Sequence, residues 1–174
     1  MSFLTSSKEP TPVDEPAGEV ATGARLLPRI TIQAFCEHSQ TAELVESAVH
    51  DRRMSKVALT THNGGLVGAI ESYRSNPTPN LIIVETSLPT EDIPGGLDRL
   101  AEVCDATTRL IVLGHVNDVL LYRELIRSGV SEYLVLPTSA QSIVNAISDL
   151  FAAEGAAPIG RTIAFVSASS VGAK

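Results

Sequence analysis

The chain has 174 residues, 44% of them apolar, and a net charge of −7, which is enough for one domain with a buried core. Its 13 basic residues are scattered, which argues against a nucleic-acid-binding surface, because such surfaces need clustered lysine and arginine. No run of about 18 apolar residues is present, so the sequence predicts no membrane span.

The two cysteines, Cys36 and Cys104, lie far apart and in no metal-binding spacing. We therefore expect two reduced thiols, no metal site and no cofactor. The amino terminus lacks the basic and apolar regions of a secretory signal, and these features together predict a cytoplasmic protein.

The first segment, residues 1–28, contains Pro10, Pro12 and Pro16, several acids and few large apolar groups. Such a segment cannot bury enough apolar surface to offset its chain entropy. We expect a disordered leader that proteases cleave early.

From residue 29 onward, strand-like and helix-like patterns alternate. Apolar runs predict five strands, at 29–35, 56–61, 80–86, 109–115 and 131–137. Helical spacing of apolar residues predicts five helices, at 39–53, 65–75, 97–104, 118–129 and 138–151. This alternation favours an α/β fold, a doubly wound five-stranded parallel sheet covered by helices on both faces.

Local signals mark the ends of three of these helices. Ser39 is a predicted N-cap, Gly129 a predicted C-terminal glycine, and Thr138 and Gln141 have the spacing of a capping box.

Binding sites in doubly wound sheets form at the carboxyl ends of the strands, near the point where strand order reverses. The residues at these ends are Cys36, Glu37, Glu85, Gly114, His115 and Leu136. His115 has no ligand partner nearby in the sequence, so we interpret it as a loop histidine.

The segment 29–152 resembles the CheY-like receiver domain of response regulators. The sequence GVSEYLVLPTS (129–139) is similar to the fifth strand and following loop of that family, and NLIIVETSLP (80–89) to its third strand and loop. The resemblance implies a flavodoxin/CheY-like (βα)5 receiver fold.

A working receiver has two acids that hold Mg²⁺, an aspartate that accepts the phosphoryl group, and a hydroxyl residue and a lysine that contact it. By resemblance, the acid pair falls on Cys36 and Glu37, and the phospho-acceptor position falls on Glu85. The two remaining positions fall on Gly114 and Leu136. We therefore expect a degenerate phosphorylation site and no catalysis.

Two of these positions allow opposite interpretations. Glu85 is either a permanently charged, phosphate-like group or only a solvated carboxylate at a strand end. Tyr133 falls on the aromatic position that moves when a receiver's pocket is filled, and its alternative interpretation is a tyrosine packed at the edge of the last strand.

The last segment, 153–174, is predicted to be a linker and the start of a missing or degenerate P-loop ATPase domain. GRTIAFVSASSVGAK (160–174) resembles the first strand and P-loop of a MinD/ParA-type ATPase. A receiver-like domain joined to such an ATPase is the layout of TadZ/CpaE pilus-assembly proteins. Serines at 167, 169 and 170 replace loop glycines, and alanines at 168 and 173 replace the lysines, so we expect no ATP hydrolysis. The alternative is an accidental Gly/Ser tail after an extra strand.

This resemblance implies a non-catalytic module for localisation and protein–protein interaction in pilus assembly. The alternative is a two-component response regulator that is phosphorylated, or regulated by a ligand, at the degenerate pocket. A third hypothesis is the front end of an ATPase.

The fourth predicted helix carries more apolar residues than one core-facing stripe needs: Val119, Leu120, Leu121, Tyr122, Leu125 and Ile126. We expect a homodimer through the face formed by 118–128, 131–136 and 139–151, with Leu121 or Tyr122 near its centre. In the alternative, the additional apolar residues of this helix pack beneath a neighbouring loop or the 162–167 strand.

Overall fold

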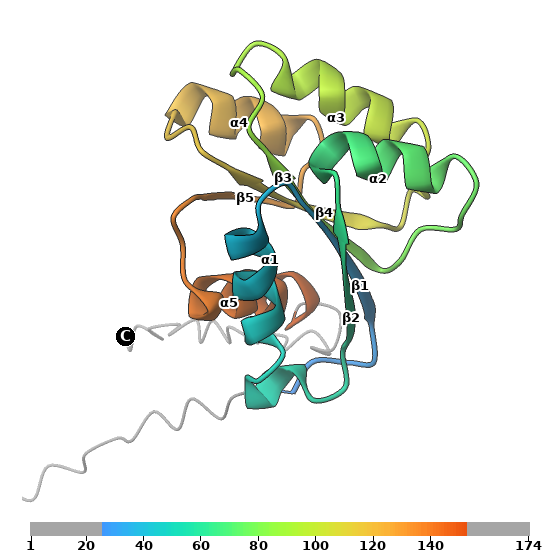
Figure 1. Ribbon diagram of the computed structural model, residues 1–174, viewed down its shortest axis with the longest axis vertical. Coiled ribbons are helices and arrows are strands. Elements are labelled where there is room, and N and C mark those ends of the chain that lie inside the picture. Colours follow the sequence, from blue (N-terminus) through green and yellow to red (C-terminus); the bar gives the residue numbers. More distant parts are fainter. Residues whose placement is uncertain (1–25, 153–174) are drawn as a thin grey trace, which may run out of the picture.

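The computed structural model describes residues 26–152, in which a five-stranded parallel sheet lies between two layers of helices (Figure 1). The strands are β1 (Thr31–Cys36), β2 (Ala58–Asn63), β3 (Leu81–Thr86), β4 (Arg109–Gly114) and β5 (Glu132–Val135). Their order is β2-β1-β3-β4-β5, and each neighbouring pair is parallel. The predicted doubly wound, CheY-like fold is confirmed.

The helices are α1 (Ser39–Ala48), α2 (Gly65–Tyr73), α3 (Ile93–Ala101), α4 (Val119–Arg127) and α5 (Ala140–Ala152), with a 3-10 turn, η1 (Arg52–Met54), after α1. Helices α1 and α5 pack side by side on one face of the sheet, and α2, α3 and α4 cover the other (Figure 1). All six residues of the central strand β3 are buried, as its continuous apolar run predicts.

The sheet divides the buried core into two apolar clusters, because successive strand residues point to opposite faces. Ile83 belongs to the cluster beneath α1 and α5, together with Val45 and Ile147. Its neighbour Val84 belongs to the cluster beneath α2, α3 and α4, together with Leu125. Each fully buried aliphatic side chain contributes about 1.5–3 kcal/mol, so both helical layers are held firmly on the sheet.

Several predicted helix ends are shifted in the structure. Ser39 is the first residue of α1 and His38 takes the N-cap position, while the helix ends at Ala48 rather than near residue 53. The hydroxyl of Ser139 accepts a hydrogen bond from the N–H of Ser142 at 3.0 Å, so this serine, and not Thr138, caps α5. Gly129 has φ +99° and follows the C-cap of α4, as predicted.

Helix α3 begins four residues before its predicted start at residue 97. Pro94 lies in its first turn, where the missing N–H of proline costs no intrahelical hydrogen bond. Gly95 and Gly96 follow it, and their poor helix propensity hides this turn from the sequence pattern.

The predicted leader 1–28 is too long at its carboxyl end. Leu27 is 3% exposed and packs in the cluster beneath α1 and α5, and its N–H donates to the carbonyl of Arg53 at 3.0 Å. The rest of that leader and the predicted segment 153–174, with its extra strand and P-loop-like sequence, lie outside the described residues. No helix within 26–152 is long and apolar enough to cross a membrane.

Candidate functional site

The site centres on Glu85, whose side chain is fully buried at the carboxyl edge of the sheet. Glu85 is the fifth residue of β3, which lies between β1 and β4. Because neighbouring parallel strands end at one edge, the loops that follow β1 and β4 meet around this carboxylate. The interpretation of Glu85 as a solvated strand-end group is therefore wrong.

Both oxygens of Glu85 accept hydrogen bonds. Oε2 accepts from the backbone N–H groups of Glu37 at 2.7 Å and His38 at 3.0 Å. Oε1 accepts from the Thr41 hydroxyl at 2.8 Å and lies 2.8 Å from Nδ1 of His38. A carboxylate has about four lone-pair sites, so these contacts nearly saturate it.

These contacts keep Glu85 ionised although it is buried. Burial by itself would raise the pKa of Glu85, but the hydrogen bonds from His38, Thr41 and Glu37 outweigh it and hold the pKa below its usual value. Glu85 therefore carries a negative charge at the carboxyl end of β3.

Two histidines face this carboxylate. Nδ1 of His38 lies 2.8 Å and Nε2 of His115 lies 3.4 Å from Oε1 of Glu85, and the two side chains are 57% and 44% exposed. His115 lies in the loop after β4, as predicted, but the fold brings it against Glu85, and the sequence analysis did not single out His38. Their positions in the sequence could have identified both histidines as site residues. They lie within two residues of the ends of β1 and β4, the strands on either side of β3, which carries Glu85.

A cavity of about 270 Å³ opens beside the three side chains, and its lining comes from β3, from α1 and from the loops after β1, β4 and β5. The lining residues are His38, Gln40, Thr41, Leu44, Glu85, His115, Leu136, Pro137 and Thr138. One donor atom from each of His38, Glu85 and His115 lies within 4.8 Å of the others, so these residues could hold a metal ion.

The other receiver-pocket positions lack the groups that phosphoryl transfer needs. Burial and, next, the charge of Glu85 raise the pKa of Cys36 to about 11, so this residue is a neutral thiol. A carboxylate oxygen of Glu37 accepts from the N–H of Ser87 at 3.0 Å. Leu136 packs against the core beneath α1 and α5 and brings no charge to the cavity, and the peptide that joins it to Pro137 is cis.

Tyr133 is buried, and its side chain reaches the space above Gly114. Its hydroxyl donates to the carbonyl of Val116 at 2.8 Å, and burial raises the pKa of the phenol. A Cβ atom at position 114 would lie 2.6 Å from both Cε2 and Cζ of Tyr133, far inside van der Waals contact. The glycine at the receiver's hydroxyl position therefore makes room for the inward tyrosine.

No protein-family model matches the sequence, and no curated protein matches it. Solved structures do match. A CpaE pilus assembly protein of Caulobacter crescentus is 46% identical over 73% of this chain and 97% of that chain, with a TM-score of 0.71. This chain belongs to the CpaE family.

A CpaE2 pilus assembly protein of Sinorhizobium meliloti is 36% identical over 70% of this chain and 99% of that chain, with a TM-score of 0.68. A LuxR-family two-component response regulator of Aurantimonas is 17% identical over 72% of this chain and 87% of that chain, with a TM-score of 0.57. The likeness to the Aurantimonas regulator shows the receiver fold alone. The resemblance to CpaE proteins and to receivers is confirmed.

The predicted interface residues of this CpaE-family domain lie on opposite sides of α4. Leu121 is 2% exposed and packs in the core with Leu125, so it does not reach the outer surface. Tyr122 is exposed, as are Val119, Leu120 and Ile126. Helical periodicity explains the error, because the core-facing stripe passes through 121 and 125 and leaves the adjacent positions outside.

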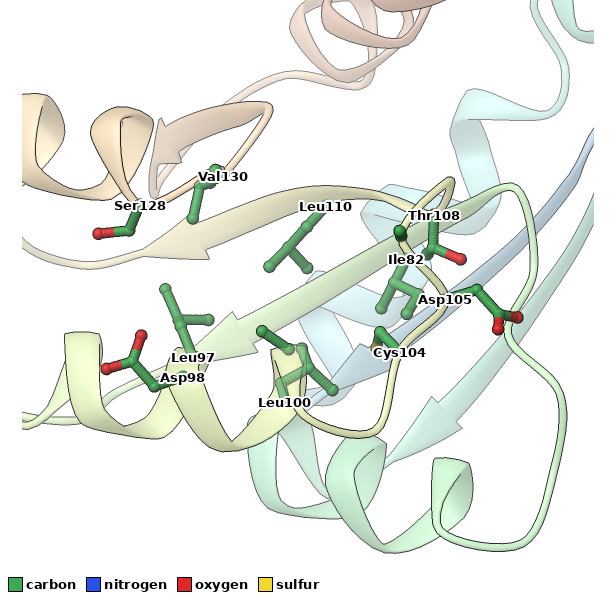
Figure 2. A pocket seen from close by; sticks show the side chains of 13 residues that line it. Ile82, Leu97, Asp98, Leu100, Cys104, Asp105, Thr108, Leu110, Ser128 and Val130 are labelled. Atoms are coloured by element: carbon green, nitrogen blue, oxygen red, sulfur yellow. The ribbon is translucent and has the colours of Figure 1, made fainter.

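The CpaE-family domain has a second cavity, of about 190 Å³, far from Glu85. Figure 2 shows Leu97 of α3 pointing toward Val130 across its apolar interior, with Asp98 and Asp105 at its margin. It lies near the amino-terminal ends of β3 and β4, beside Ile82 and Leu110. Cys104 also lines it, and burial raises the pKa of this thiol.

Proposed function

We propose that residues 26–152 form a non-catalytic receiver-like module of a pilus-assembly protein, and that the module pairs with a second copy of itself through α4. The likeness to pilus assembly proteins of Caulobacter and Sinorhizobium supports the pilus-assembly role. The observation that carries the pairing is the exposed apolar surface of α4.

Seven large apolar side chains are exposed among residues 26–152, and four of them lie on α4. Val119 is 62% and Leu120 is 74% exposed, and Tyr122 and Ile126 are exposed beside them. Exposed apolar residues gathered on one helix are typical of an interaction surface, because water contact with them is unfavourable. We call these four residues the α4 patch.

The surroundings of the α4 patch favour a second copy as the partner. Arg123 and Arg127 are exposed on α4, and Glu124 and Glu132 carry the opposite charge on α4 and β5. A two-fold axis through the patch would place the basic groups of one copy near the acidic groups of the other. A hollow of about 130 Å³ beside Val119 and Tyr122 offers a place for an apolar side chain of the second copy.

The chemistry of the Glu85 pocket supports a non-catalytic module. A phosphoryl acceptor needs an oxygen that is free to attack, and both oxygens of Glu85 are held by Glu37, His38 and Thr41. A neutral Cys36 and an apolar Leu136 then leave no acid pair for Mg²⁺ and no cation for the developing charge.

Sedimentation of the full chain at micromolar concentrations tests the pairing. We expect a dimer for the unmodified chain and a folded monomer for Val119→Glu and for Leu120→Glu, because a buried unpaired charge in the interface is strongly unfavourable. Val67→Glu is a matched control, since Val67 on α2 is 61% exposed and lies outside the α4 patch.

The control variant should remain a dimer, and far-UV circular dichroism should be unchanged in all three. A monomer for the unmodified chain at about 100 µM, where micromolar pairing would be nearly complete, contradicts the proposal. So does a dimer that survives both α4 substitutions.

A further inference from the structure

We propose that His38, Glu85 and His115 form a binding site for one divalent first-row transition metal ion of the Zn²⁺ type, with water completing its coordination. The site is independent of pairing through α4. It uses the three side chains that the fold gathers at the carboxyl edge of the sheet, two of which have no counterpart in the five receiver-pocket positions described above.

The donor set selects the class of ion. Two imidazole nitrogens and one carboxylate oxygen suit Zn²⁺ and its first-row neighbours, whereas Mg²⁺ and Ca²⁺ prefer oxygen ligands alone.

The spacing of the donor atoms is close to what such an ion needs. A tetrahedral ion with bonds of about 2.0–2.2 Å separates its ligand atoms by about 3.3–3.6 Å. Nε2 of His115 already lies 3.4 Å from Oε1 of Glu85, and Nδ1 of His38 lies 2.8 Å from the same oxygen. An outward shift of about 0.5 Å at His38 would bring its distance from Glu85 into this range, and its half-exposed side chain leaves room for the shift.

Neighbouring groups hold the buried ligand in position. The N–H groups of Glu37 and His38 bind Oε2 of Glu85, and the Thr41 hydroxyl binds Oε1, so the carboxylate cannot rotate freely. Outer hydrogen bonds of this kind orient metal ligands in known sites. The N–H groups of Glu37 and His38, at the start of α1, carry partial positive charge that would repel a cation. Their hydrogen bonds to Oε2 of Glu85 offset that charge.

The site is reachable from solvent. Both histidine side chains are about half exposed, and the adjoining cavity of about 270 Å³ has room for the ion and its waters. The three ligands come from the β1–α1 loop, the end of β3 and the β4–α4 loop. A bound ion would therefore link three segments that are distant in sequence and stabilise the folded chain.

Titration of the untagged, chelator-treated full chain with Zn²⁺ tests the proposal by calorimetry. We expect one ion per chain with micromolar or tighter affinity, a raised Tm, and no heat from Mg²⁺. Co²⁺ serves as a spectroscopic probe, and intense visible absorption would report tetrahedral coordination.

The four histidines of the chain provide matched variants. His38→Ala and His115→Ala should each weaken Zn²⁺ binding by at least about tenfold. His50→Ala and His62→Ala should leave it unchanged, because both residues lie outside the cluster. His38→Ala should fold, since its side chain makes no capping hydrogen bond to α1.

A measurement on the unmodified chain guards against misfolded variants. On addition of Zn²⁺, the ring-proton resonances of two histidines should shift and those of the other two should remain. Equal affinity in all four alanine variants, or the absence of both heat and Co²⁺ absorption, would overturn the proposal.

Discussion

The ring of Tyr133 occupies the space that any side chain at position 114 would need. Its hydroxyl binds the carbonyl of Val116, two residues beyond Gly114 and just before α4 begins at Val119. The inward tyrosine thus ties β5 to the loop between the Glu85 site and the α4 patch.

Substitution of Gly114 by threonine should therefore be destabilising. We expect Gly114→Thr to lower the free energy of unfolding by about 1–3 kcal/mol, because the ring must move out of a packed position. Urea unfolding measures this. Gly95→Ala is the control, since a Cβ there meets nothing within 4 Å, and it should be neutral or slightly stabilising.

The cause can be tested in a double-mutant cycle. If the Tyr133 ring is the obstacle, Gly114→Ala should cost much less stability in a Tyr133→Ala background than in the unmodified chain. Additive effects of the two substitutions would show that the strain at position 114 has another source.

Removal of the Glu85 side chain should be among the most damaging single changes in this domain. Glu85→Ala leaves the N–H groups of Glu37 and His38 and the Thr41 hydroxyl without their acceptor, and we expect a loss of about 3–5 kcal/mol. Glu71→Ala, at an exposed position on α2, should change stability by less than about 0.5 kcal/mol. Equal losses of stability for Glu85→Ala and Glu71→Ala in chemical denaturation would show that the hydrogen bonds of Glu85 do not stabilise the fold.

The lowered pKa of Glu85 predicts a specific loss of stability in acid. A carboxyl group whose pKa is lower in the folded than in the unfolded chain stabilises the fold above its unfolded pKa, about 4.3 for glutamate. That contribution disappears as pH falls through the folded pKa. The stability difference between the unmodified chain and Glu85→Gln should thus be largest near neutral pH and shrink below about pH 4.3.

Urea unfolding of both proteins at several pH values measures this difference, in which the other acids of the chain cancel. A difference that stays constant, or grows in acid, would mean that the Glu85 pKa is not lowered.

The chain should not accept a phosphoryl group. Incubation with a small phosphodonor and Mg²⁺ should leave its intact mass unchanged, because both oxygens of Glu85 are engaged and Cys36 is a neutral thiol. Stoichiometric acid-labile phosphate on Glu85 would restore the response-regulator hypothesis.

The interface through the fourth helix stays a prediction, but the structure buries Leu121, one of the two residues expected near its centre. The excess of apolar residues at 119–126 identifies α4, since no single stripe can bury them all. Leu121 and Tyr122 are adjacent, however, and the pattern alone does not say which faces the sheet. The packing of α4 on β4 and β5 turns Leu121 inward and leaves Tyr122 at the surface.

The sequence by itself determined the strand and helix order and the edge at which the candidate site forms, and it led to the prediction that Cys36, Glu85 and Leu136 replace a receiver's reactive groups. These features depend on local periodicity and on the identity of residues at strand ends, both of which can be read along the chain. Only the tertiary structure decided that Glu85 is buried and fully hydrogen-bonded, and that His38 and His115 meet it. Those residues are separated by 30 or more positions, and contacts at that range depend on how β1, β3 and β4 pair in the sheet.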